Sequence, residues 1–387
     1  MIKTKFLKIK NFSKNIKSNN LKKRLNEILS SNHEVINSLK LNYDYSFSRK
    51  LIRKFNAKKK SINLIGMGGS ILGTKAIYSF LRKKIKTNVT FIDNLSPNLK
   101  INKNKNLNIV VSKSGNTLET IINANIYIKQ KQENIFITED KNSLLRNLAL
   151  KLKAEIIDHN NFIGGRYSVL SEVGMLPASL MGLNIKNFKR YNDLIKNKKF
   201  VDGLVTNVAC IFYFIKKKKF NSVVLNYDED SQDLFKWYQQ LVAESLGKKG
   251  KGIFPIVSSM PKDNHSLLQL YLDGPKNNFF TIFYADQKKT HKIVDKSYFN
   301  LDENLVNKSI IDIIGSKKIA TENIFSKKNI PYRSFDILEK NEETLGELFT
   351  FFILETILLG KIMRVDPFDQ PAVELLKKET KKILKKN

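Results

Sequence analysis

The chain has 387 residues, 42% of them hydrophobic, which is enough to bury two ordinary cores rather than one. The net charge of +32 points first to nucleic acid or an anionic membrane, but the lysines are spread along the whole chain and the aromatic residues stand in apolar runs, so neither partner is expected. The single cysteine, Cys210, excludes an internal disulfide, and no apolar run suits a signal peptide or a spanning helix, so we expect a cytoplasmic protein.

The predicted elements change character along the chain. Residues 1–58 read as helices and polar connections, because Leu21, Leu25 and Leu29 recur at helical spacing. After residue 60, short apolar runs alternate with helical stretches of roughly 10–15 residues, which indicates parallel sheets covered on both faces. Strands are predicted at 61–65, 89–92, 108–111, 134–138 and 154–157, and again at 222–225, 253–257, 279–283 and 332–337. Helices are predicted at 348–363 and at about 370–385.

This order of elements predicts an α/β protein with two doubly wound, three-layer domains on parallel sheets, N-terminal helices and a C-terminal helical arm. The expected bounds are 1–58 for the N-terminal helical segment, 59–198 for the first sheet domain, 199–360 for the second, and 361–387 for the arm.

The stretch SKSGNTLET, residues 112–120, follows a predicted strand and opens a predicted helix. In a parallel sheet, such a position presents unpaired N–H groups and a partial positive charge to ligands. The hydroxyls of Ser112, Ser114 and Thr117 and the ammonium of Lys113 are suited to a phosphate monoester. The alternative is that the hydroxyls only cap the helix.

A second polar turn, GMGGS at residues 66–70, follows the first predicted strand. Gly69 permits close approach of the backbone to a ligand, and Ser70 can donate a hydrogen bond. The turn lacks the GxGxxG spacing of dinucleotide-binding proteins, and no GxxxxGK[ST] occurs in the chain. Two polar turns on neighbouring strands favour a small polyol with one phosphate, although tight turns without a ligand remain the alternative.

Three further stretches carry possible chemistry. Arg166 stands beside two glycines in a predicted loop, where it can stabilise an oxyanion or form an ordinary ion pair. Gln240 and Glu244 share one face of a predicted helix beside its glycine-bearing end, and Glu244 can equally form a surface pair with Lys248. His265 begins a predicted helix. No His, Cys, Asp and Glu spacing suggests a metal site.

Taken in order, six stretches of the chain resemble the glucose-6-phosphate isomerase (phosphoglucose isomerase) family, whose members are built from two sugar isomerase (SIS) domains. The stretches are GMGGSILG, SKSGNTLET, GGRYSVLSEVGMLP, QQLVAESLGK, PKDNHSLLQLYLDGP and DPFDQPAVELLKKETKK, and they extend from about residue 61 to the C-terminus. The resemblance implies reversible isomerisation of glucose 6-phosphate and fructose 6-phosphate, a step of glycolysis and gluconeogenesis, without a cofactor or metal.

The resemblance also implies roles for single residues. Glu244 corresponds to the carboxylate that moves a proton between C1 and C2, and Arg166 to the arginine facing the enediolate. His265 corresponds to the ring-opening acid/base, which the partner subunit of a homodimer supplies in this family, and Lys377 to the lysine that assists ring opening. The implied substrate contacts are Gly69, Ser70, Ser112, Lys113, Ser114, Thr117, Gln240 and Gln370. Because a proton-abstracting carboxylate works best away from water, we expect Glu244 to be buried.

Two alternatives to this function are open at the level of sequence. The enzyme can also accept mannose 6-phosphate, or the chain can be a non-catalytic SIS protein that senses a sugar phosphate, since fold alone does not settle function. The joint presence of Glu244, His265 and Lys377 favours an enzyme, and no nucleic-acid motif is recognisable in residues 1–58.

Overall fold

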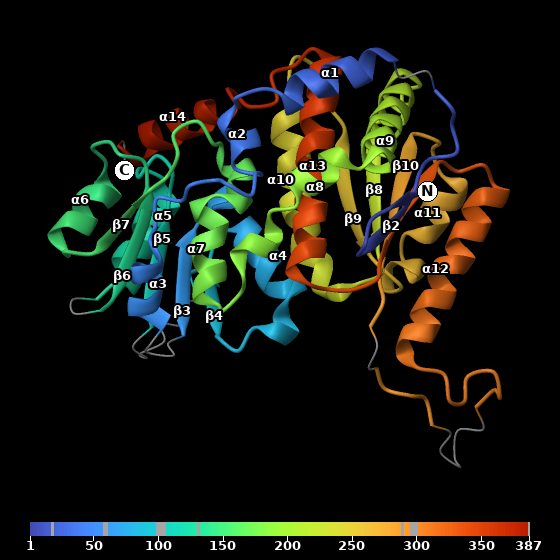
Figure 1. The fold of residues 1–387 in the computed structure, drawn as a ribbon, viewed down its shortest axis with the longest axis horizontal. Helices are drawn as coiled ribbons and strands as arrows, with labels where there is room; N and C mark the ends of the chain where they lie inside the picture. The colour runs from blue at the N-terminus through green and yellow to red at the C-terminus, as the bar shows by residue number, and fades with distance from the viewer. Residues whose placement is uncertain are drawn as a thin grey trace.

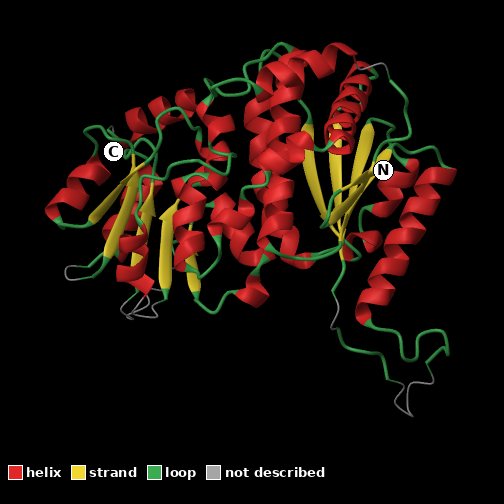
Figure 2. Cartoon of the chain, in the orientation of Figure 1, coloured by secondary structure: helices red, strands yellow, loops and turns green. Residues whose placement is uncertain are grey.

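The computed structural model describes residues 1–16, 19–56, 61–97, 106–129, 132–287, 290–294 and 301–385. Two α/β units lie next to each other, each built on its own sheet (Figures 1 and 2). The boundary expected between residues 58 and 59 and the last two residues of the expected arm lie outside the described ranges.

The first sheet has five parallel strands in the order β4-β3-β5-β6-β7. They are β3 (Ile62–Gly66), β4 (Val89–Ile92), β5 (Leu107–Val111), β6 (Asn134–Thr138) and β7 (Glu155–Asp158). The chain passes from β3 outward to β4 and returns on the other side of β3 at β5. The order therefore reverses at the carboxyl ends of β3 and β5, where open α/β sheets usually bind ligands.

The second sheet has six strands in the order β1-β2-β11-β10-β8-β9. Four of them are parallel: β8 (Asn221–Asn226), β9 (Phe254–Ser259), β10 (Asn278–Ala285) and β11 (Tyr332–Ile337). The predicted α/β fold with two parallel-sheet units is thus confirmed.

The N-terminal residues differ from the prediction, which gave residues 1–58 only helices and polar connections. β1 (Ile2–Lys3) and β2 (Leu7–Lys10) are strands, and β2 pairs antiparallel with β11 so that Ile9 lies opposite Phe335. In β2 the two apolar residues are buried and the lysines are more exposed, which is the alternation of a half-buried edge strand. The first ten residues therefore cover the edge of the second sheet at β11, which is the strand of that sheet most distant from them in sequence.

The helices fill the space between the sheets and cover their outer faces. They are α1 (Asn19–Leu29), α2 (Glu34–Asn37), α3 (Arg49–Asn56), α4 (Leu72–Phe80), α5 (Leu118–Tyr127), α6 (Leu144–Lys151), α7 (Glu172–Leu180), α8 (Tyr191–Lys196), α9 (Lys198–Lys216), α10 (Gln232–Leu246), α11 (Leu268–Asp273), α12 (Ile310–Lys327), α13 (Glu342–Met363) and α14 (Val373–Leu384). α4, α10 and α13 lie between the two sheets (Figure 1). α13 is buried around nearly its whole circumference, which explains why apolar residues occur on all of its faces. Within the described ranges, none of the helices combines the length and apolar character that crossing a bilayer requires.

A buried lysine joins the N-terminal segment to the first unit. Lys189 donates to the carbonyl oxygens of Ser38 and Leu170, the latter at 2.6 Å. Its ammonium also lies 4.8 and 4.9 Å from the ring centroids of Tyr43 and Tyr45. These contacts replace water around a charge that is only 4% exposed, and so tie residues 38–45 to the body of the protein.

Lys189 should make the stability of the protein depend on pH. Burial lowers the pKa of its ammonium from 10.5 to about 7, while the Glu172 carboxylate acts in the opposite direction. Between these two pKa values the unfolded state binds more protons, so the free energy of unfolding should rise with pH, by up to about 1.4 kcal/mol per unit from this group. Urea unfolding between about pH 7 and 9 should show a steeper rise in the wild type than in Lys189→Met. Equal slopes would contradict the assignment.

Candidate active site

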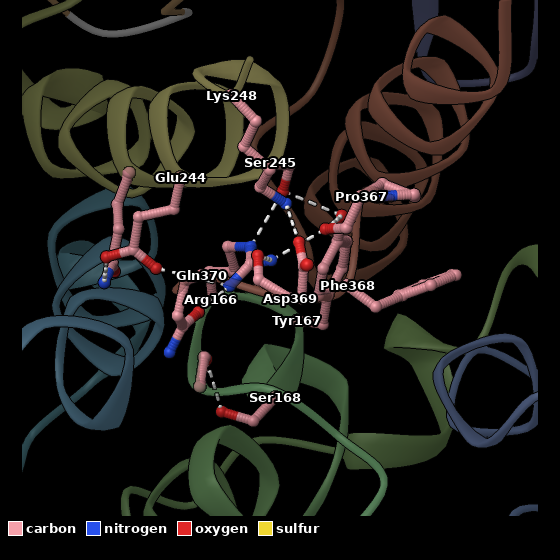
Figure 3. A network of polar contacts seen from close by, with 12 residues as sticks. Arg166, Tyr167, Ser168, Glu244, Ser245, Lys248, Pro367, Phe368, Asp369 and Gln370 are labelled. Carbon is pink, nitrogen blue, oxygen red and sulfur yellow. Dashed lines mark hydrogen bonds and ion pairs between the residues drawn. The ribbon is translucent and has the colours of Figure 1, made fainter. Parts of the chain in front are cut away.

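Arg166 lies at the centre of the candidate site, in a 3-10 helix (Gly165–Leu170) that contacts both units (Figure 3). Only 1% of its surface is exposed, so the predicted loop arginine is in fact a buried cation. Its Nε donates to Ser245 Oγ at 2.8 Å, and its Nη2 donates to the carbonyl oxygens of Pro367 and Asp369 at 2.7 and 3.0 Å. The guanidinium is therefore fixed on the side that faces the body of the protein.

The remaining nitrogen of this guanidinium, Nη1, faces the functional side chains. It donates to Glu244 Oε2 at 3.3 Å and to the amide oxygen of Gln370. Gln240, one turn earlier on α10, donates from Nε2 to Glu244 Oε1 at 2.8 Å. The structure thus brings together Arg166, Gln240, Glu244 and Gln370, all of which the sequence had indicated as site residues.

Glu244 is less buried than expected, because 28% of its side chain is exposed. Its apolar neighbours Leu241, Val242 and Leu246 are buried, since they form the core-facing side of α10. The carboxylate stands on the other face of the helix, so these neighbours do not enclose it. The alternative of a surface pair with Lys248 does not hold, because Lys248 pairs with Asp369 at 2.6 Å.

Two glycines allow the turn after β3 to approach this group. A Cβ on Gly69 would lie 2.2 Å from the carbonyl carbon of Gly165 and 2.5 Å from the backbone nitrogen of Arg166. Gly68 has a φ of +52°, and a Cβ there would lie 2.9 Å from Gln240 Nε2. The turn that contains Ser70 therefore packs directly against the segments that carry Arg166 and Gln240.

The SKSGNTLET turn lies beside it, because β3 and β5 are neighbours and Gly66 pairs with Val111 at their carboxyl ends. The Ser112 and Thr117 hydroxyls are 3.0 Å apart, and Asn116 N donates to Ser114 Oγ at 3.3 Å. Thr117 occupies the N-cap of α5 but makes no side-chain capping bond. The capping alternative therefore does not explain the hydroxyls of Ser112 and Thr117.

Lys113 has protein partners of its own in this turn. Its Nζ donates to the Asn161 carbonyl at 2.7 Å and lies 3.6 Å from Glu139 Oε1. Burial lowers the pKa of Lys113, and the Glu139 carboxylate opposes that shift. Part of its charge is therefore balanced before any anion arrives.

His265 lies far from Glu244 within the same chain. It is exposed in a 3-10 helix (Lys262–His265) that follows β9. At the end of β9, Ser259 Oγ is 3.2 Å from Oε1 of Gln232, in the first turn of α10. Glu244 stands near the other end of α10, about 18 Å along the helix axis. One chain therefore does not bring these two residues together.

Lys377 is paired with a residue of its own helix rather than with Arg166 or Glu244. It lies on α14, which the structure describes in full and which has no buried residue. Its Nζ is 2.6 Å from Glu374 Oε1 on the same helix, and both side chains are more than half exposed. In the described part of the chain, no group of three His, Cys, Asp or Glu side chains could hold a metal ion.

The sequence did not indicate several residues that hold Arg166. Tyr167 donates to the Pro367 carbonyl at 3.0 Å and lies 2.8 Å from Ser245 Oγ, while Trp237 Nε1 donates to the Arg166 carbonyl at 3.1 Å. Burial raises the pKa of Tyr167 to about 12, so its hydroxyl remains a donor at neutral pH. The one signal that could have indicated Tyr167 and Ser245 is that each directly follows a predicted site residue, in the motifs GGRYS and AESLG.

Comparison with known proteins places these residues in a family. The profile of the family described as phosphoglucose isomerase matches residues 54–387. A glucose-6-phosphate isomerase of Methanocaldococcus jannaschii is 32% identical over 356 residues, covering 85% of this chain and 86% of that protein.

Two solved structures share the fold. A hypothetical protein from Thermus thermophilus superposes with a TM-score of 0.82 at 22% identity, covering 94% of both chains. A glucose-6-phosphate isomerase from Chlamydia trachomatis superposes with a TM-score of 0.71 at 17% identity, covering 97% of this chain and 80% of that one.

The close packing at Gly69 predicts a sharp contrast between two glycines that face each other. Gly69→Ala should lower the free energy of unfolding by about 3 kcal/mol or more, because its Cβ would overlap backbone atoms that cannot move independently. Gly165→Ala is the matched control, since the nearest atom to its Cβ would be 3.5 Å away, and it should cost less than about 1 kcal/mol. Urea unfolding measures both, and similar losses in the two variants would contradict the packing argument.

Proposed function

The chain belongs to the phosphoglucose isomerase family, and we propose that it interconverts glucose 6-phosphate and fructose 6-phosphate by ring opening and proton transfer through a cis-enediolate. The observation that carries this proposal is the pair of Glu244 and Arg166, whose charged groups are 3.3 Å apart. The pair lies against the Gly68–Ser70 turn, at the reversal point of the first sheet. A base and a fixed cation therefore stand next to an anion-binding edge.

The phosphate group is proposed to bind at the carboxyl ends of β3 and β5. Ser70, Ser112, Ser114 and Thr117 supply hydroxyl donors, and the N-terminus of α5 adds unpaired N–H groups and the positive end of the helix dipole. Lys113 contributes a partly balanced charge. The sugar would then extend from this edge toward α10.

Glu244 is proposed to act as the base of the isomerisation. It takes the proton from C2 of the open-chain aldose, which leaves a cis-enediolate with its charge on O1. A proton then passes from O2 to O1, and return of the first proton to C1 gives the ketose. Its hydrogen bond from Gln240 at 2.8 Å fixes one carboxylate oxygen, so the other is directed toward Arg166. The partial exposure of Glu244 gives the substrate access to the carboxylate.

Arg166 is proposed to stabilise the negative charge of the enediolate. Every N–H group of its guanidinium already has a partner. An oxygen of the intermediate must therefore replace one of the two acceptors at Nη1. Of these two, Gln370 is the exposed residue and the one that we expect to be displaced. The contacts of Nε and Nη2 keep the cation in place during this exchange, which is the preorganisation that charge stabilisation requires.

Ring opening is assigned to His265 and Lys377. His265 follows β9, beside the first turn of α10, whereas Glu244 lies in the last turn of α10. We therefore propose a homodimer in which each site receives His265 from the partner subunit. α14 has no buried residue, so packing does not hold Lys377 away from the site. A hexose phosphate substrate and one buried cysteine suit a cytoplasmic location.

The base assignment predicts loss of catalysis without loss of binding. Glu244→Gln should lower kcat for conversion of fructose 6-phosphate to glucose 6-phosphate by about a hundredfold to ten-thousandfold, because the amide cannot accept the proton from C1 of the ketose. A coupled assay with a chelator present measures kcat, and calorimetry measures sugar-phosphate binding. Glu303→Gln, on an exposed residue remote in sequence from the site motifs, is the control. Near-normal turnover in Glu244→Gln would remove this residue from the role of base.

The shared site predicts complementation between two inactive variants. Neither Glu244→Gln nor His265→Ala should convert closed-ring substrate efficiently alone. If the two are unfolded together and refolded, mixed dimers contain one site with both residues intact, so activity should return to about a quarter of the wild-type value. Activity that stays at the level of the separate variants would contradict a site shared between subunits.

A further inference from the structure

His33, in the N-terminal part of the chain, stacks on Phe368, which belongs to the C-terminal segment that holds Arg166. The rings of His33 and Phe368 are nearly parallel, with centroids 3.9 Å apart and an interplanar angle of 18°. The centroid of the Phe368 ring also lies 5.6 Å from that of Tyr167. Phe368 therefore contacts both a histidine of the N-terminal segment and a tyrosine adjacent to Arg166 in the chain.

The segment 366–370, which we call the strap, connects α13 to α14. Its carbonyls at Pro367 and Asp369 accept from Arg166 Nη2, and its Gln370 side chain accepts from Nη1 (Figure 3). The strap is also held by Tyr167, whose hydroxyl donates to the Pro367 carbonyl, and by Lys248, which donates to the Asp366 carbonyl and pairs with Asp369. The only aromatic side chain of the strap is Phe368, between these attachments.

The His33 ring is held rigidly from its own side. His33 is the N-cap of α2, and its Nδ1 accepts from the Val35 backbone nitrogen at 3.1 Å. Val35 and Ile36 are buried, so α2 is anchored in the core. Burial lowers the pKa of His33, with the carboxylates of Glu34 and Asp366 acting against that shift, and a neutral ring suits the acceptor role of Nδ1.

A cavity of about 210 Å³ borders both rings, lined also by Ile36, Ile357 and Lys361. Phe368 is thus incompletely packed on that side, and removing the histidine ring would leave it room to turn away. If the ring draws the backbone of Phe368 with it, the Pro367 carbonyl is displaced, because it shares a peptide unit with the Phe368 nitrogen, and so is the carbonyl of the next residue, Asp369.

We propose that His33 is a positioning residue, whose ring holds the strap in place through Phe368 and thereby keeps Arg166 aligned for the isomerisation. The inference rests on the proposed function for its catalytic readout. It assigns a role to a histidine that touches neither the phosphate turns nor Glu244. Its effect should fall on kcat, because Arg166 meets the charge of the enediolate rather than the ground-state phosphate.

Two substitutions separate the ring from the cap. His33→Asn keeps a good N-cap for α2 but removes the stacked ring, and should lower kcat about 3- to 10-fold with KM changed less than about 2-fold. His33→Phe keeps an aromatic ring but removes the cap, and should lower stability while kcat stays within about 2-fold of the wild type. His291→Ala, which removes an exposed histidine, should leave both constants unchanged.

Hydrogen exchange followed by mass spectrometry supplies a readout that needs no activity. Amides of residues 364–372 should exchange faster in His33→Asn than in the wild type, while His33→Phe should match the wild type there and exchange faster around α2. Equal kcat in His33→Asn and the wild type, or equal losses of kcat in both variants, would overturn the positioning role. If the wild type lacks isomerase activity, the proposed function fails, and unchanged exchange of 364–372 in His33→Asn would separately overturn the action of His33 on the strap.

Discussion

The buried guanidinium of Arg166 is the constraint on which the rest of the site depends. An unpaired charge in that position would cost several kcal/mol, so the surrounding segments must supply acceptors to every N–H group. They come from α10, through Ser245 and Glu244, and from the strap, through Pro367, Asp369 and Gln370. Segments separated by about two hundred residues are thereby brought to one point, and the base of the proposed reaction is one of the acceptors.

The two sheets show why only one reversal point suits an anion. After β3 the first sheet has glycines and Ser70, and the SKSGNTLET turn adds hydroxyls. After β8 the second sheet has Asp228 and Asp230, which bind Lys340 at 2.9 and 2.8 Å. Asp228 is only 3% exposed, so its charge is committed to this internal network. A phosphate would meet carboxylates at the second point and donors at the first.

The candidate site was predictable to the extent that its residues lie in local motifs. The helical spacing of Gln240 and Glu244 fixed their common face, and the polar turns after two strands indicated an anion site, because these depend on neighbours in the chain. The burial of Arg166, its contacts to the strap and the stack of His33 on Phe368 join residues from distant segments. Glu244 was expected to be buried and is partly exposed, because its apolar neighbours face the core on another side of α10.

The sequence by itself determined the alternation of strands and helices, and with it the two parallel sheets, since burial on both faces imposes continuous apolar runs that are visible in one dimension. It also contained the alternation of Leu7 and Ile9 with lysines, which signals an edge strand, but not the partner of that strand. Only the tertiary structure decided that β2 covers β11, that Arg166 is buried, and that His265 and Glu244 of one chain stand apart. The physical reason is that periodicity reports which face of an element is buried, whereas the identity of the element packed against it depends on how the whole chain closes.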